Sequence, residues 1–93
     1  MNHAGALEAV ERILNRGGQP EDVLIDVLEA LHVRGVGYAA IRFGGRELAV
    51  GAPRDGIESP IVVDGMQTGT FVLGTDDPTF VARVATLISP YVR

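Results

Sequence analysis

The chain of 93 residues contains no cysteine, no lysine and no tryptophan. The absence of cysteine excludes disulfide bonds, thiolate nucleophiles, thiolate zinc ligands and attachment of a tetrapyrrole through sulfur. The absence of lysine excludes a lysine Schiff base, and all eight basic residues are arginines. Several classes of covalent and metal chemistry are therefore closed to this protein.

Basic charge and long apolar runs are also scarce. Twelve acidic residues stand against eight basic ones, which gives a formal net charge of −4. A nucleic-acid-binding face needs a dense cluster of basic side chains, so we expect neither nucleic acid nor an anionic membrane surface as a partner. The apolar stretches are far shorter than a membrane span, and the N-terminus lacks the pattern of a signal peptide. These features predict a cytoplasmic protein.

Three segments show the apolar periodicity of amphipathic helices. The first covers residues 4–16 and stops before Gly17, because glycine tolerates the left-handed conformation that follows a helix. The second begins at Pro20, whose missing N–H costs nothing in a first turn, and ends at Gly35.

The third helical segment covers residues 78–92. Asp77 precedes it as a good N-cap, and Pro78 suits its first turn. Pro90 removes one backbone hydrogen bond, so we expect the last turn to fray or kink.

Two β-hairpins are predicted between the second and third helices. Gly44-Gly45 joins the first pair of extended runs and Asp64-Gly65 joins the second, because both dipeptides suit the positive φ angles of tight turns. Residues 51–56 have turn chemistry, and a fifth strand would form only if the residues near 53–58 also pair. The expected strand regions are residues 36–43, 46–50 and the two arms of 58–74.

This order of elements predicts a single α+β domain over residues 1–93. We expect an antiparallel sheet of four to five strands, an N-terminal helix pair and a C-terminal helix. The helices should gather on one face of the sheet, because each amphipathic helix must bury its apolar stripe.

Alternation along the expected strands separates two sheet faces. The face expected under the helices comprises Ala39, Ile41, Phe43, Leu48, Val50, Ile61, Val63, Phe71 and Leu73. The other, mixed face comprises Tyr38, Ala40, Arg42, Glu47, Ala49, Val62, Asp64, Thr68, Thr70 and Val72. A solvated sheet face is normally more polar than this. The mixed face is therefore either a solvated surface with tolerated apolar residues, or a surface covered by a ligand, a second subunit or the 51–58 loop.

One candidate ligand site lies on the mixed face and comprises Tyr38, Arg42, Thr68 and Thr70. Arg42 offers forked donors to an anion, and Tyr38 offers a flat surface with a polar tip. These residues could hold a small anionic or aromatic effector. Alternatively, Arg42 and Glu47 form a cross-strand surface pair of little energetic value.

Metal binding and catalysis find little support in the sequence. His3 falls at a terminus expected to fray, and His32 falls in a last helical turn, where it complements the helix dipole. Helix capping explains Asp76 and Asp77 better than metal binding does. Neither serine sits on a nucleophile elbow. We therefore expect no metal, no cofactor and no enzyme activity.

The whole chain resembles a GAF domain, which is a small-molecule-sensing and dimerising module. Residues 6–34 resemble its paired N-terminal helices, and residues 36–50 resemble its first hairpin. Residues 58–74 resemble its last two strands, with an Asp-Gly turn, Gly69 in the following strand and an apolar run ending at Gly74. The order of these elements carries the resemblance, and the implied arrangement is PAS- or profilin-like.

One departure from the family pattern concerns the ligand pocket. GAF domains normally insert a long helical and loop segment between the first hairpin and the last strands. In this chain only residues 51–58 occupy that place. The implied pocket is shallow or open. The Asn-Lys-Phe-Asp-type signature of cyclic-nucleotide-binding members is absent, as are the cysteines of sulfoxide reductase members. The resemblance still implies a homodimer through residues 4–16 and 78–92, with Tyr91 or Val92 as outward apolar surface.

The sequence thus predicts a non-catalytic, bacterial-type signalling or regulatory module that acts through homodimerisation or protein–protein interaction. One alternative is a sensor that binds a small-molecule effector on the mixed sheet face. Another is a roadblock- or profilin-like adaptor, which shares the arrangement of helices and sheet and dimerises through a sheet edge or a helix. The sequence names neither the effector nor the partner.

Overall fold

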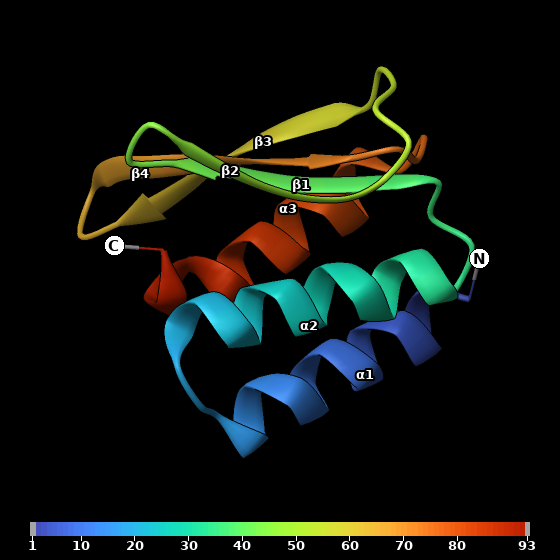
Figure 1. Ribbon diagram of the computed structural model, residues 1–93, viewed down its shortest axis with the longest axis horizontal. Coiled ribbons are helices and arrows are strands. Elements are labelled where there is room, and N and C mark those ends of the chain that lie inside the picture. The colour runs from blue at the N-terminus through green and yellow to red at the C-terminus, as the bar shows by residue number, and fades with distance from the viewer. Residues whose placement is uncertain (1, 93) are drawn as a thin grey trace.

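A computed structural model describes residues 2–92 of the chain (Figure 1). The helices are α1 (His3–Arg16), α2 (Pro20–Val33) and α3 (Pro78–Ile88), followed by the 3-10 turn η1 (Ser89–Tyr91). The strands are β1 (Tyr38–Phe43), β2 (Arg46–Gly51), β3 (Ile57–Val63) and β4 (Met66–Leu73). The predicted α+β class and the predicted order of elements are confirmed.

The four strands form one antiparallel sheet in the order β2-β1-β4-β3. Both hairpins turn through two residues with positive φ, which are 56° and 75° at Gly44-Gly45 and 53° and 79° at Asp64-Gly65. These angles belong to type I′ turns, whose twist matches that of paired strands. Residues 52–56 add no fifth strand to the described chain, and instead cross from β2 at one edge to β3 at the other.

The helices gather on one face of the sheet, as expected (Figure 1). Helix α2 packs beneath β1 and β2, and α3 packs beneath β3 and β4. Helix α1 contacts α2 and α3 on their side away from the sheet, which makes a third layer. One core unites these layers through Val10 of α1, Leu28 of α2, Phe71 of β4 and Val84 of α3.

The inner sheet face largely follows the predicted alternation. Fully buried members are Ala39, Ile41, Ile61, Phe71 and Leu73, and half-buried members packed on the core are Phe43, Leu48 and Val50. Val63 lies beyond a bulge between Ile61 and Val62, and is only half-buried. The extra residue of this bulge is Thr68 of β4, so the alternation of faces is interrupted in β4 and continues through Val63 in β3.

The C-terminal residues differ from the expectation. Helix α3 ends at Ile88, because Pro90 cannot donate the hydrogen bond that a further helical turn requires, and η1 follows. Val92 is fully buried in the core, so its predicted role as outward apolar surface is wrong. Tyr91 is half-buried, and its hydroxyl donates to the carbonyl oxygen of Leu14 at 3.1 Å.

Candidate functional site

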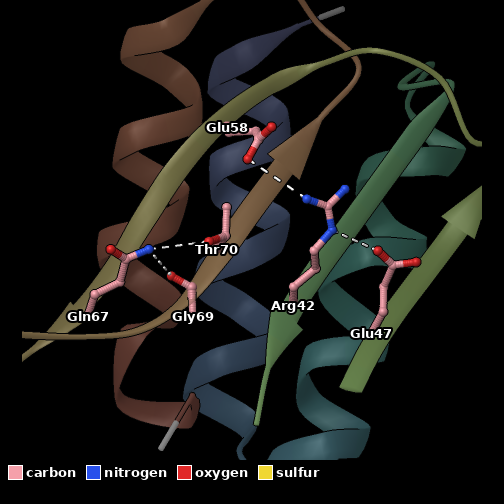
Figure 2. Close-up of polar contacts among 6 residues, drawn as sticks. All are labelled: Arg42, Glu47, Glu58, Gln67, Gly69 and Thr70. Carbon is pink, nitrogen blue, oxygen red and sulfur yellow. Dashed lines mark hydrogen bonds and ion pairs between the residues drawn. The ribbon is translucent and has the colours of Figure 1, made fainter. Parts of the chain in front are cut away.

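Arg42 occupies the centre of the outer sheet face, which is the face turned away from the helices (Figure 2). It lies directly opposite Glu47 on β2 and Thr70 on β4. Its Nε donates to Oε2 of Glu47 at 2.9 Å, and its Nη1 lies 3.8 Å from Oε1 of Glu58 on β3 (Figure 2). The cross-strand pair with Glu47 is therefore present, and Glu58 extends it across the sheet.

These two carboxylates determine the electrostatics of the outer face. The hydrogen bond to Glu47 raises the pKa of Arg42, and the charge of Glu58 acts in the same direction. One guanidinium is therefore paired with two carboxylates, so the cluster carries an excess of negative charge. All three side chains are about half exposed, so solvent screens the pairs and each contributes little to stability. An anionic ligand at Arg42 would have to displace one of these carboxylates.

Tyr38 lies deeper in the outer face than the sequence indicates. It is 4% exposed and forms a small buried cluster with Ala40 and Val72. The crossover 52–56 passes the adjoining strand ends, where the Arg54 side chain lies close to the backbone next to this cluster. Ala40 and Val72 are thus covered within the single chain, and little of the Tyr38 ring is left for contact with a ligand.

The two candidate threonines have different surroundings. Thr70 lies beside Arg42, and its Oγ1 accepts a 3.3 Å hydrogen bond from Nε2 of Gln67 (Figure 2). Thr68 lies at the bulge, and its hydroxyl donates to the carbonyl oxygen of Ile61 at 3.4 Å. The structure therefore brings Thr70 to Arg42, and holds Thr68 nearer to the hairpin turn.

A shallow depression of about 610 Å³ lies between the tips of the two hairpins. Its lining includes Arg42, Gly44, Arg46, Gln67 and Thr68. Arg46 forms an ion pair with Glu21 of α2, and its guanidinium lies 5.4 Å from the ring centroid of Phe43. Both guanidinium groups at this depression therefore already have partners.

Sequence reasoning missed Glu58 and Gln67 at this site. Glu58 approaches Arg42 only because β4 lies between β1 and β3 and sets their relative register. Gln67 and Thr70 are three residues apart in β4, and a regular strand would place them on opposite faces. The bulge between them brings both side chains to the same face, where they form a hydrogen bond. Neither relationship has a local signal, since both depend on long-range strand pairing.

The histidines make structural contacts. His3 is the first residue of α1 and lies 3.0 Å from Asp77, so the expectation that it frays is wrong. The ring Nδ1 of His32 lies 2.8 Å from the carbonyl oxygen of Val36. Within residues 2–92, no group of three histidine, aspartate or glutamate side chains could hold a metal ion.

No helix in the described part of the chain is long and apolar enough to cross a membrane. No protein-family model matches the chain, and it matches neither a curated protein nor a solved structure.

Proposed function

We propose that this chain is a non-catalytic regulatory module with a GAF-like arrangement, which acts through homodimerisation or protein–protein interaction in bacterial-type cytoplasmic signalling. The observation that best supports this proposal is the pairing of Arg42 with both Glu47 and Glu58. The candidate ligand face thereby carries an excess of negative charge, on the same side of the sheet as the buried cluster of Tyr38, Ala40 and Val72. Such a surface disfavours capture of an anionic effector, which supports an interaction module over an anion sensor.

The exposed apolar side chains do not gather on the two helices expected to form the dimer. Large apolar residues that remain exposed in residues 2–92 are Val33, Val62 and Met66, and none of them lies on α1 or α3. The outward positions of α3 include Ala82, Arg83 and Thr86. Helices α1 and α3 carry the partly buried apolar side chains Leu7, Ile13, Leu14 and Leu87, but none of these is as exposed as Val33, Val62 or Met66. The distribution therefore favours a contact surface outside the face of α1 and α3.

Sedimentation equilibrium over a wide range of protein concentration tests the proposal. We expect a reversible dimer, and we expect Arg42→Gln to leave its dissociation constant nearly unchanged because the exposed charge cluster contributes little energy. Arg42→Gln is preferable to a change at Tyr38, because Tyr38 is part of the buried cluster. A wild-type chain that stays monomeric throughout, and pairs with no protein, would contradict the proposal.

The second candidate function is an effector sensor, and the depression beside Arg42 and Thr68 favours it. A bound effector stabilises the folded state by mass action, by about 2.7 kcal/mol at a hundredfold excess over its dissociation constant. Thermal unfolding with nucleotides, amino acids and tetrapyrroles is the direct measurement. A stabilisation that disappears in Arg42→Gln would favour the sensor, whereas an unchanged melting temperature across the screen would favour the interaction module.

A further inference from the structure

The two edges of the sheet differ in their protection against pairing with another chain. Edge strand β3 carries Pro60, which has no N–H to donate, and its ladder with β4 is interrupted by a bulge opposite Ile61 and Val62, whose extra residue is Thr68 of β4. Proline and bulges are devices by which natural sheets prevent edge-to-edge association. Edge strand β2 has neither device, and it pairs with β1 residue for residue along its whole length.

The hairpin geometry determines which backbone groups of β2 face outward. In a hairpin with a two-residue loop, the residues that flank the loop form a hydrogen-bonded pair, which here is Phe43 with Arg46. Alternate residues along β2 then point their N–H and C=O groups toward β1. The residues whose groups face the open edge are Glu47, Ala49 and Gly51. No strand of the described chain pairs with this side of β2.

Apolar side chains lie incompletely buried beside this edge. Ile25 of α2 is half-buried, and it lies on the same helical stripe as Glu21 and His32. This stripe faces β2, because Glu21 pairs with Arg46 at one end of the strand and the His32 ring lies close to Gly51 at the other. The open edge is therefore bordered by apolar surface that a second subunit could cover.

We propose that the β2 edge pairs with the β2 edge of a second copy of this chain, antiparallel and about a two-fold axis at Ala49. The inference rests on the proposed self-association and names its surface. The two four-stranded sheets would then form one continuous sheet, with the same residues contributed by both subunits. The backbone groups that face the open edge would all acquire partners.

The charge pattern of β2 is compatible with this register and disfavours pairing about Glu47. Pairing about Ala49 places Glu47 of one copy opposite Gly51 of the other, and the half-buried Leu48 opposite Val50. No like charges are then opposed. Pairing about Glu47 would place two carboxylates directly opposite one another, which is destabilising.

Cross-linking through a single engineered cysteine tests the register without ambiguity, because the chain has no cysteine of its own. In Ala49→Cys the two Cα atoms would lie about 5.5 Å apart across the axis, within the range that a disulfide spans. We expect a covalent dimer under mild oxidation. The matched control is Ala82→Cys, an exposed position on α3. Cross-linking of Ala82→Cys as fast as Ala49→Cys would overturn the proposal.

Two further substitutions test the same edge by sedimentation equilibrium. Ala49→Pro removes an outward N–H but leaves the β1 ladder intact, and Ala49→Glu places two carboxylates opposite each other across the axis. Each should raise the dimer dissociation constant by about tenfold or more, whereas Ala82→Glu should not. The urea midpoint shows that each variant is folded, and Ala49→Glu decides the matter if Ala49→Pro does not fold.

The outcomes distinguish the two proposals. A wild-type dimer that persists unchanged in the folded Ala49 variants overturns the β2 edge and leaves self-association standing. A wild-type monomer at every concentration overturns the edge proposal and self-association together.

Discussion

The imidazole ring of His3 stacks on the phenyl ring of Phe80, with 4.5 Å between ring centroids and 15° between ring planes. The Nδ1 atom of the same imidazole lies 3.0 Å from Oδ2 of Asp77, which caps α3. Asn2 caps α1 at the same end of the molecule by accepting from the N–H of Gly5 at 3.0 Å. The N-terminal turns of α1 and α3 are therefore held together by one side chain.

The first prediction concerns the stack itself. His3→Ala should lower the free energy of unfolding by about 0.5–1.5 kcal/mol, which is the range for an aromatic pair. The polar contact with Asp77 should add little, because both side chains are more than a third exposed. Urea unfolding followed by circular dichroism measures the change. His3→Phe keeps a stacking ring and should retain most of the stability, so equal losses in both variants would contradict the stacking account.

The second prediction concerns the N-cap of α3. Oδ1 of Asp77 accepts from the N–H of Phe80 at 3.1 Å, so Asp77→Ala should cost about 1 kcal/mol of unfolding free energy. Asp77→Asn keeps a capping oxygen and should lose much less. Chemical denaturation of the two variants distinguishes the contribution of the capping hydrogen bond from that of the carboxylate charge. If Asp77→Asn lowers the free energy of unfolding as much as Asp77→Ala does, the capping hydrogen bond is not what stabilises α3.

The third prediction concerns the close approach of backbone at Gly69. A Cβ at this position would lie 2.6 Å from the carbonyl oxygen of Arg42, and 3.1 Å from side-chain atoms of both Phe43 and Val92. Gly69→Ala should therefore lower the free energy of unfolding by roughly 1–3 kcal/mol, because backbone and core must shift.

The matched control for this substitution is Gly5→Ala in α1. A Cβ at Gly5 meets only the Asn2 side chain at ordinary contact distances of 3.5 Å or more. Alanine is also the better helix former, so this variant should gain about 0.5–1 kcal/mol. Guanidinium unfolding measures both variants, and loss of stability in both would mean that the distances at Gly69 are not the cause.

The fourth prediction concerns the anchor of the C-terminal turn. The Tyr91 hydroxyl donates to the Leu14 carbonyl, and so ties η1 to α1. Tyr91→Phe keeps the ring and removes only this donor, so it should cost about 0.5–1.5 kcal/mol. For a domain of this size the melting temperature should fall by about 4–8 °C per kcal/mol. An unchanged melting temperature would show that the bond contributes nothing.

Only one of the two carboxylates that contact Arg42 could be predicted from the local sequence. The pairing of Arg42 with Glu47 could be predicted, because a two-residue turn at Gly44-Gly45 places these two positions opposite each other. The contact with Glu58 could not be predicted, because it requires knowing that β4 separates β1 from β3. Turn chemistry acts within a few residues, whereas strand order depends on contacts across the whole chain.

The depth at which a side chain is buried also could not be predicted from the local sequence. Alternation assigned Tyr38 and Val72 to the outer face, and the β1–β4 register is consistent with that assignment. It did not show that these residues form a buried cluster, since covering them depends on where the crossover 52–56 passes. Nor did it show that Val92 turns into the core after Pro90.

By itself, the sequence determined the type and order of the elements, the tight turns at the two hairpins, the cap at Asp77 and the apolar face that packs on the helices. These features follow from backbone preferences and from periodicity, which act locally. Only the tertiary structure decided the strand order β2-β1-β4-β3, the carboxylates that surround Arg42 and the sheet edge that stays open. The physical reason is that periodicity assigns a side chain to a face, whereas packing of distant segments decides what covers that face and which strand lies at the edge.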